Sequence, residues 1–295
     1  MTILDGKKVS NDIKNEIKAE VDKMKANDEK VPHLAAVIVG NDGASLTYVG
    51  SKVRACERVG FESTMVRMSN TTSEVELLDK IEELNNNDDI DGFIIQLPLP
   101  PQINTQKVLM AVNPDKDVDG FHPMNFGKMS LDMSTFIPAT PFGILELLDR
   151  YGVETKGKHT VVIGRSHIVG RPMSILMGRK GFPGNSTVTL THSHTKNITQ
   201  ITSQADIIIS ALGIPKFLKA EMVKDDVVIV DVGITRVPDD SDKGYYITGD
   251  VDFATVSKKA SFITPVPGGV GPMTIAMLLK NTLIARDQHR KANRL

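Results

Sequence analysis

Apolar residues in the first part of the chain recur with the period of a helix. They stand three or four positions apart, with charged residues between them, at Val9, Ile13, Ile17, Val21 and Met24. This spacing places them all on one face of an α-helix. We therefore expect an amphipathic helix that ends near Asn27.

The next part of the chain alternates short apolar runs with longer helical patterns. Strands are expected at residues 34–40 (LAAVIVG), 61–68 (FESTMVRM) and 91–100 (DGFIIQLPLP), and helices at residues 45–60 and 73–86. The glycine that closes the first of these helices is a typical helix stop, and the prolines of the third strand prevent it from continuing inside a sheet. The alternation predicts right-handed strand–helix–strand crossovers onto a largely parallel sheet.

A second series of strands follows a connecting helix at residues 140–153, which carries Pro141 at its start. A further helix is expected at residues 168–181, after the first of four strands at residues 159–164, 186–191, 205–213 and 226–233. This second α/β series predicts a doubly wound, Rossmann-like sheet.

The two series predict an α/β protein of two domains with a cleft between them. We assign residues 1–139 to the first domain and residues 140–271 to the second. The last helical pattern, residues 272–295, follows the proline and glycine cluster TPVPGGVGP, and we expect it to pack back onto the first domain.

Composition excludes several classes of protein. Of 295 residues, 40% are hydrophobic and 24% are charged, as in soluble globular proteins. No apolar run approaches the roughly 20 residues of a membrane helix. The first residues lack the features of a signal or transit peptide, so we expect a cytoplasmic protein with no membrane partner. The single cysteine, Cys56, excludes an internal disulfide and a thiolate cluster, and we expect it to be a buried apolar side chain.

Charge is spread unevenly along the chain. The formal net charge of −1 argues against a nucleic-acid-binding protein. The segment from Thr155 to Ala205, however, holds seven lysines and arginines and no acidic residue. An acid-free segment in a slightly acidic protein indicates that this part of the chain handles a compact anion.

A glycine-containing loop stands between the first strand and the helix of the second domain. The sequence VVIGRSHIVGRP places Gly164, Ser166 and Gly170 there, where backbone N–H groups and the helix dipole can hold a pyrophosphate. The pattern is G-x-S-x-x-x-G and not the usual G-x-G-x-x-G, and by itself it also fits an ordinary turn between strand and helix.

The end of the following strand favours NADP over NAD. An NAD-specific site usually has an acidic residue there, whereas this strand ends in Thr191, His192, Ser193 and His194. Hydroxyl and imidazole groups can donate to a ribose 2′-phosphate, and Arg165 can pair with it. The two histidines also fit half of a metal site, but no third ligand of suitable type is placed nearby.

Three polar residues of the first domain are candidates for chemistry. Tyr48 and Lys52 are four positions apart on one expected helix and share a face of it. Gln96 stands at the carboxyl end of an apolar strand, where parallel sheets bind ligands. Each also has an ordinary interpretation, as a surface pair and as a cap on exposed backbone.

The segment DKDVDGFHP at residues 115–123 places three aspartates at alternate positions. It matches the first half of a calcium-binding loop, but Phe126 stands where that loop requires a bidentate glutamate. Asp119 could instead accept paired N–H donors from a flat heterocycle such as a pterin. We therefore expect no metal ion here.

Five of these stretches together resemble one family. YVGSK at 48–52, QLPLP at 96–100, DKDVDGFHP, GRSHIVGRP at 164–172 and TPVPGGVGPMT at 264–274 are similar to the bifunctional methylenetetrahydrofolate dehydrogenase and methenyltetrahydrofolate cyclohydrolase. The resemblance runs from about Leu4 to the final helix. It implies a folate-binding catalytic domain, an NADP-binding domain, and NADP⁺-dependent oxidation of 5,10-methylenetetrahydrofolate followed by hydrolysis to 10-formyltetrahydrofolate.

The resemblance also implies roles for individual residues. Lys52 would be the catalytic lysine, supported by Gln96, while Tyr48 would pack on the aminobenzoyl ring of the folate and Asp119 would bind its pterin. Cofactor positions are Gly164, Arg165, Ser166, Ser193 and Ile234. Residues that would line the cleft near folate and nicotinamide are Pro267, Gly268 and Gly269.

The same resemblance implies a homodimer formed through the cofactor domains, and a place in one-carbon metabolism and purine biosynthesis. Three other functions stay open from sequence: a monofunctional methylenetetrahydrofolate dehydrogenase, a dehydrogenase of the shikimate or amino-acid type, and a regulatory dinucleotide-binding protein. The second leaves YVGSK and PGGVGP unexplained, and the third would be expected to have lost Lys52 or Asp119.

Overall fold

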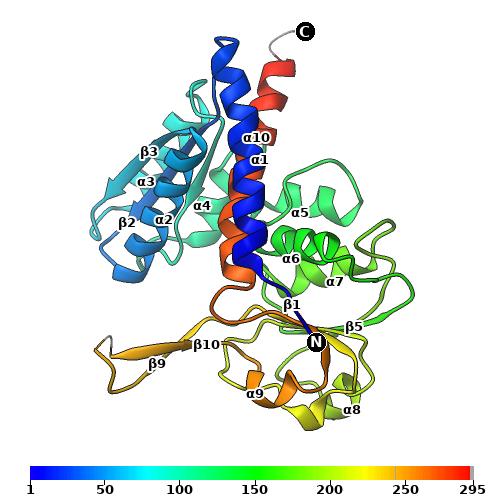
Figure 1. The fold of residues 1–295 in the computed structure, drawn as a ribbon. Helices are drawn as coiled ribbons and strands as arrows, with labels where there is room; N and C mark the ends of the chain where they lie inside the picture. The colour runs from blue at the N-terminus through cyan, green and yellow to red at the C-terminus, as the bar shows by residue number, and fades with distance from the viewer. Residues whose placement is uncertain (243, 293–295) are drawn as a thin grey trace. The chain divides into compact units, whose positions relative to one another are not determined.

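The computed structural model describes residues 1–242 and 244–292, which form two compact units. Unit 1 contains Met1–Ser10 and Thr140–Thr274, and unit 2 contains Asn11–Ala139 and Ile275–Leu295. Figure 1 labels many of the helices and strands of both units. Within the described residues, no helix combines the length and the apolar character needed to cross a bilayer.

Unit 2 is built on a parallel sheet of three strands in the order β3-β2-β4. These strands are β2 (His33–Val39), β3 (Glu62–Met68) and β4 (Gly92–Ile95). Strand β4 ends just before Gln96, earlier than the apolar run suggested, because the prolines that follow lack N–H donors for the sheet. The predicted strand–helix alternation is therefore present in this unit.

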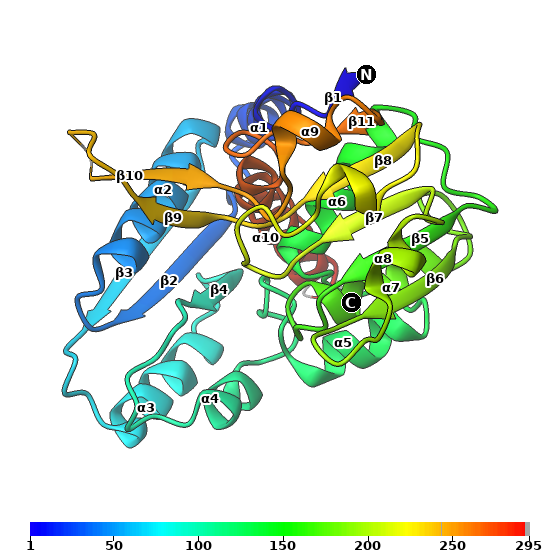
Figure 2. The ribbon, with the colours of Figure 1, turned by 90° about the horizontal axis from the view of Figure 1, so that it is seen from below.

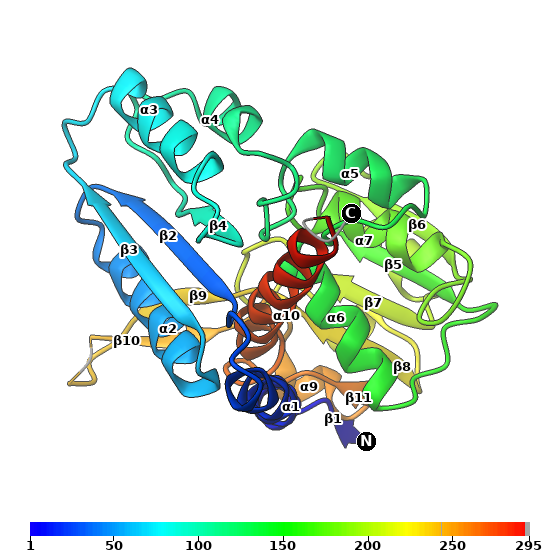
Figure 3. The ribbon, with the colours of Figure 1, turned by 90° about the horizontal axis from the view of Figure 1, so that it is seen from above.

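Helices cover both faces of this sheet. Helix α2 (Gly43–Val59) packs against β2 and β3, while α3 (Glu74–Asn85) and α4 (Thr105–Ala111) lie on the opposite side, as Figure 3 shows. The core under α3 and α4 comes from alternate strand positions, which the side-chain period of two directs to one face. Its members include Ala35, Val37, Val39, Leu77, Ile81, Phe93 and Ile95.

Two long helices complete unit 2. They are α1 (Gly6–Ala26), which carries the predicted apolar stripe and belongs to this unit from Asn11 onward, and α10 (Val270–Ala292). The side chain of Asn281 on α10 donates to the carbonyls of Val118 and Ile137 at 2.8 and 3.0 Å, so the greater part of this helix belongs to unit 2. The last residues of the expected 272–295 helix, 293–295, lie outside the described residues. The short helix α5 (Pro123–Ser130) also belongs to this unit.

Unit 1 contains a parallel sheet of six strands in the order β1-β11-β8-β7-β5-β6. Its strands are β1 (Thr2–Ile3), β5 (His159–Ile163), β6 (Thr187–Thr191), β7 (Ile207–Ser210), β8 (Val227–Asp231) and β11 (Ala260–Ile263). Figure 2 shows β8, β7, β5 and β6 lying side by side. The sequence-based division assigned residues 1–139 to one domain, whereas Met1–Ser10 groups with unit 1 because β1 pairs with β11.

The central strands of unit 1 are buried along their whole length, as both faces of this sheet are covered. The accompanying helices are α6 (Ala139–Arg150), α7 (Gly170–Gly178), α8 (Ile198–Thr202) and α9 (Phe253–Val256), with a 3₁₀ turn at Ala220–Met222. The core of one face includes Val161, Ile163, Ile208, Leu218, Val227, Ile229 and Val256. Continuous apolar strands of this kind are typical of doubly wound folds.

Several short elements of unit 1 were not predicted from sequence. Strands β9 (Thr235–Pro238) and β10 (Tyr245–Thr248) form a separate antiparallel hairpin, and β11 and β1 extend the parallel sheet. Each has at most four residues, too few to establish a hydrophobic period against the surrounding turns.

Candidate active site

Lys52 is a buried amine in the middle of α2. The helix begins at Asp42, whose carboxylate accepts the N–H of Ser45 at 2.7 Å, and it ends at Gly60, which adopts a φ of 81°. Between these caps, Lys52 is only 5% exposed. The Nζ of Lys52 lies 4.6 Å from the ring centroid of Tyr48, one helical turn earlier. The two residues that the sequence placed on one helix face are therefore in contact.

Gln96 brings an amide oxygen to the same amine. Its Oε1 lies 3.3 Å from Nζ of Lys52, while its Nε2 donates to the carbonyl of Leu97 at 2.7 Å. The second contact requires an N–H donor, so it fixes which end of the amide faces the lysine. Gln96 thus offers an acceptor to Lys52 whether the amine is charged or neutral, without adding a charge of its own.

Burial lowers the pKa of Lys52, because removal from water disfavours the ammonium form. The carboxylate of Asp119 acts in the opposite direction and partly restores that pKa. Burial also raises the pKa of Asp119, whereas the positive charge of Lys52 lowers it. The structure therefore brings Tyr48, Lys52, Gln96 and Asp119 into one constellation within unit 2.

The loop that carries Asp119 is organised by Asp117. The Asp117 carboxylate accepts the N–H groups of Phe121 and His122 at 3.2 and 2.7 Å and the side-chain amide of Asn125 at 2.9 Å. Burial raises the pKa of Asp117 to about 7, against the effect of these donors. Sequence reasoning singled out Asp119 but missed the structural role of Asp117, because alternation alone does not tell which aspartate turns inward.

The three aspartates of this loop do not converge on one point. Asp115 is exposed, Asp117 faces backbone donors, and Asp119 interacts with Lys52. Gly120 at φ 71° makes the turn after them, and a Cβ there would lie 2.7 Å from the nitrogen of Pro138. Within residues 1–242 and 244–292, no group of three potential metal ligands is found.

The second set of candidate residues lies in unit 1, at the carboxyl edge of the sheet. Gly164 follows β5 with a φ of 111°, and a Cβ on it would lie 2.3 Å from the carbonyl oxygen of Ala211. A Cβ on Gly170 would lie 2.0 Å from the carbonyl oxygen of Gly164. Only glycine fits at either position, so the loop keeps its backbone free of side chains where the helix begins.

Ser166 bridges this loop to α7. Its hydroxyl oxygen accepts the N–H groups of Val169 and Gly170 at 3.2 and 3.3 Å, which satisfies donors at the start of the helix. The hydroxyl proton stays available to a ligand. The loop after β5 and the start of α7 together form the kind of cradle that binds a pyrophosphate.

Arg165 of this loop interacts electrostatically with His192, which follows β6, the strand paired with β5. Arg165 and Ser193 are exposed, and Ile234 is 60% exposed. Burial, the charge of Arg165 and the neighbouring His194 all lower the pKa of His192. The N–H of His194 donates to Nδ1 of His192 at 3.2 Å, so this ring nitrogen is an acceptor within the turn and is not directed at a metal ion.

Pro267, Gly268 and Gly269 form a tight loop after β11. Gly268 has a φ of 110°, its carbonyl accepts the N–H of Lys7 at 2.9 Å, and the N–H of Gly269 donates to Pro265 at 2.8 Å. A Cβ on Gly6 would lie 1.8 Å from the carbonyl oxygen of Gly269. The amino-terminal residues thus fix this loop within unit 1.

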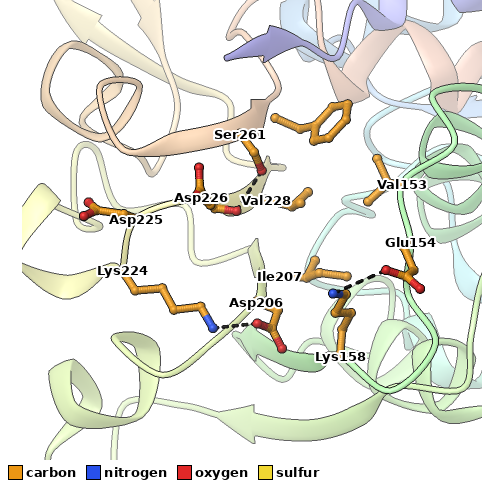
Figure 4. A pocket seen from close by; sticks show the side chains of 11 residues that line it. Val153, Glu154, Lys158, Asp206, Ile207, Lys224, Asp225, Asp226, Val228 and Ser261 are labelled. Atoms are coloured by element: carbon orange, nitrogen blue, oxygen red, sulfur yellow. Dashed lines mark hydrogen bonds and ion pairs between the residues drawn. The ribbon is translucent and has the colours of Figure 1, made fainter.

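A pocket of about 430 Å³ lies at the opposite, amino-terminal edge of the same sheet. Its charged side chains are largely paired: Lys224 contacts Asp206 at 2.5 Å and Lys158 contacts Glu154 at 3.4 Å (Figure 4). None of the sequence-predicted site residues lines it. The candidate cofactor residues lie instead at the edge where parallel sheets bind nucleotides.

Two family models match the chain. The model for the catalytic domain of tetrahydrofolate dehydrogenase/cyclohydrolase matches residues 4–119, and the model for the NAD(P)-binding domain of the same family matches residues 138–290. The two matches together account for most of the sequence.

Named relatives and solved structures agree with these models. A protein of Flavobacterium psychrophilum named bifunctional protein FolD is 82% identical and aligns with 99% of this chain and 100% of its own. The crystal structure of the bifunctional FolD enzyme of Campylobacter jejuni has a TM-score of 0.92 at 45% identity, with both chains fully covered. A Trypanosoma brucei FolD structure, complexed with NADP and an inhibitor, has a TM-score of 0.92 at 35% identity and covers 100% of this chain and 99% of that chain.

Proposed function

The chain belongs to the tetrahydrofolate dehydrogenase/cyclohydrolase family, and we propose that it catalyses two consecutive reactions of one-carbon metabolism. It oxidises 5,10-methylenetetrahydrofolate to the 5,10-methenyl form with NADP⁺, and it then hydrolyses that product to 10-formyltetrahydrofolate. The observation that carries this function is the buried amine of Lys52, held by Gln96 beside Tyr48 and Asp119.

We assign the central catalytic role to Lys52. The methenyl intermediate is a cation, so hydrolysis requires water to attack a positively charged carbon. An ammonium group would be repelled by this cation, whereas a neutral amine can take a proton from the water. The lowered pKa of Lys52 supports that assignment, because it enlarges the neutral fraction near neutral pH.

Gln96 supports Lys52 by accepting a hydrogen bond from the amine without supplying a charge. A carboxylate in its place would raise the pKa of the lysine and hold the proton on it. A neutral amide beside Lys52 therefore suits a general base, because the amine must gain and lose a proton in each catalytic cycle.

We assign substrate binding to Asp119 and Tyr48. A carboxylate can accept two N–H donors from the edge of a pterin, and an aromatic ring can pack on the aminobenzoyl group of the folate. Pro267, Gly268 and Gly269 are assigned to the binding of folate and nicotinamide by family resemblance.

The loop after β5 fits a dinucleotide. Gly164 and Gly170 leave the backbone accessible, Ser166 keeps a hydroxyl proton to donate, and Arg165 supplies positive charge. The end of β6, which is followed by Ser193, has no acidic residue of the kind found in an NAD-specific site, and we assign Ser193 and Ile234 to contact with the cofactor. When bound, NADP⁺ supplies the hydride acceptor for the oxidation.

A monofunctional dehydrogenase and a shikimate-type dehydrogenase are not favoured. The relatives from Flavobacterium psychrophilum and Campylobacter jejuni are both named bifunctional. A Thermus thermophilus shikimate 5-dehydrogenase structure is only 13% identical with a TM-score of 0.50, a likeness that concerns the fold alone. We further propose that the protein is a cytoplasmic homodimer that associates through its cofactor domains and contributes to purine biosynthesis. Light scattering tests the dimer.

One reaction tests the proposed function. Purified protein is mixed with methylenetetrahydrofolate and either NADP⁺ or NAD⁺, and reduced cofactor and 10-formyltetrahydrofolate are followed separately. We expect both products with NADP⁺. Accumulation of the methenyl compound would leave a monofunctional dehydrogenase, and an absence of turnover with either cofactor would refute the proposal.

A further inference from the structure

Two buried aspartates lie beneath the loops at the carboxyl edge of the unit 1 sheet. Asp231 is the last residue of β8 and is 4% exposed, and Asp250 follows β10 and is 0% exposed. Among the described residues, neither forms an ion pair. The proposed chemistry uses neither of them. A carboxylate at such depth must be held by hydrogen-bond donors, and these donors identify what it organises.

Asp250 holds the loop that follows β7. Its Oδ2 accepts the N–H of Leu212 at 2.6 Å, and its Oδ1 accepts the N–H of Ile214 at 2.9 Å. Each oxygen therefore serves a different residue of one short loop. The same loop begins at Ala211, whose carbonyl is the group that excludes a Cβ from Gly164 in the phosphate cradle.

Asp231 connects two further loops. Its carboxylate accepts the N–H groups of Gly233, Asp250 and Val251 at 3.0, 2.9 and 3.0 Å. Its own N–H donates to Oγ1 of Thr264 at 2.7 Å, at the start of the loop that contains Pro267. The hydrogen bonds of Asp231 therefore extend to Gly233, the residue before Ile234, and to the segment after β11.

Glycines make room for these carboxylates. A Cβ on Gly233 would lie 2.2 Å from Oδ1 of Asp250, and a Cβ on Gly249 would lie 1.9 Å from Oδ2 of Asp231. The backbone and the two carboxylates are thus packed without space for any other side chain. This fit indicates that the two aspartates help to set the positions of the loops, together with backbone contacts such as that from the N–H of Lys216 to the carbonyl of Gly249 at 3.1 Å.

We propose that Asp250 and Asp231 are positioning residues for the nicotinamide cofactor, acting through the backbone of residues 211–214 and 231–234. Neither side chain touches the cofactor. The inference rests on the proposed function, since it requires NADP⁺ to bind over these loops. Their loss should weaken cofactor binding and leave the chemistry at Lys52 intact.

Asp250→Asn tests this role with little change in size. An amide has one acceptor oxygen, so it cannot accept both N–H groups, and its NH₂ would face one of them. We expect the KM for NADP⁺ to rise about tenfold, with kcat at saturating NADP⁺ within about threefold of the parent. Hydrolysis of supplied methenyltetrahydrofolate, measured without NADP⁺, should stay within about twofold.

Asp225→Asn is the matched control, because Asp225 is exposed at the amino-terminal edge of the sheet. This variant should leave the KM for NADP⁺, kcat and the rate of hydrolysis unchanged. An unchanged KM for NADP⁺ in Asp250→Asn would overturn the inference while leaving the proposed function intact. Equal loss of both activities would assign Asp250 a purely structural role and would also overturn it. A parent protein inactive with NADP⁺ would instead refute the proposed function.

Circular dichroism establishes whether Asp250→Asn folds. If it does not, Asp231→Ala is measured in the same way, since it removes the acceptor for the N–H of Gly233 in the 231–234 loop, together with those for Asp250 and Val251. A raised KM for NADP⁺ with intact hydrolysis supports the inference, and an unchanged KM rejects it.

Discussion

The Nζ of Lys52 lies 3.3 Å from Oε1 of Gln96, and the opposite end of the same amide is fixed by the carbonyl of Leu97. The lysine comes from a helix and the glutamine from the end of a strand, so tertiary structure alone makes them neighbours. Their pairing gives a buried amine an acceptor without a counter-charge. This relationship allows the amine to act as a base near neutral pH.

Replacing Gln96 by glutamate should replace the neutral acceptor of Lys52 with a charged one and so prevent the lysine from acting as a base. A carboxylate 3.3 Å from Nζ would raise the pKa of Lys52 and keep the amine protonated. We expect hydrolysis of methenyltetrahydrofolate to fall by about 100-fold or more at pH 7, the order of a general-base contribution. The rate is measured over a range of pH, and the exposed Gln200→Glu serves as control. A rate close to that of the parent would contradict the role given to the neutral amide.

Removing the amine itself gives a second prediction. Lys52→Met keeps an apolar stem in the buried position but has no base, so hydrolysis should fall by about 100-fold to 10,000-fold. Protein folding is checked by thermal unfolding, because the change leaves the buried carboxyl of Asp119 without its positive neighbour. Near-normal hydrolysis by this variant would refute the assignment of Lys52 as the base.

Asp119→Asn should change both substrate affinity and pH dependence. The carboxylate of Asp119 raises the pKa of Lys52, so its loss lowers that pKa further. The rising limb of the hydrolysis rate should therefore move to lower pH, while the KM for the folate should increase about tenfold through the lost charged hydrogen bonds. Steady-state kinetics between pH 5 and 9 measure both. A shift of the limb to higher pH would contradict the proposed interaction.

Asp117 should make the protein less stable as the pH rises. Its pKa is about 7 in the folded protein and about 4 in the unfolded chain, so the folded state binds more protons between these values. The contribution of Asp117 to the free energy of unfolding is fully present below about pH 4 and is lost as the pH rises through 7. The free energy of unfolding falls over this range with a slope of up to ~1.4 kcal/mol per pH unit. Asp231, with a pKa of about 6, acts in the same direction.

Urea unfolding of Asp117→Asn from pH 4 to 8 tests this, because the amide does not titrate. We expect the free energy of unfolding of the variant to depend less steeply on pH than that of the parent. Asp115→Asn, at an exposed position of the same loop, should keep the slope of the parent. Equal slopes in Asp117→Asn and the parent would show that Asp117 does not titrate in this range.

Gly170→Ala should impair the phosphate cradle. Its Cβ would lie 2.0 Å from the carbonyl oxygen of Gly164, so the loop and the start of α7 must move apart. We expect the KM for NADP⁺ to rise at least about tenfold and hydrolysis without cofactor to change little. Gly178→Ala is the control, since the nearest atom to its Cβ is 3.8 Å away. An equal KM for NADP⁺ in the two variants would contradict the proposal that this loop binds the pyrophosphate of the cofactor.

Hydrophobic periodicity identified the long elements. The stripe from Val9 to Met24 became α1, and the helix expected to stop at Gly60 ends there as α2. The runs at 159–164 and 226–233 contain β5 and β8. These features are local, because residues a few positions apart suffice to define a period or a stop. Residue patterns singled out candidates such as Lys52, Gln96 and Asp119, and family resemblance supplied their roles and the function.

The tertiary structure decided the rest. Asp115, Asp117 and Asp119 are equivalent in the sequence pattern, yet only the fold directs Asp117 to backbone donors and Asp119 to Lys52. Likewise Asp231 and Asp250, 19 residues apart, meet through the pairing of distant strands and loops. Burial and the neighbours brought by long-range packing set the hydrogen-bond partners and pKa of each carboxyl, and no local pattern encodes them. The sequence by itself determined which groups are available, and the tertiary structure determined which of them act together.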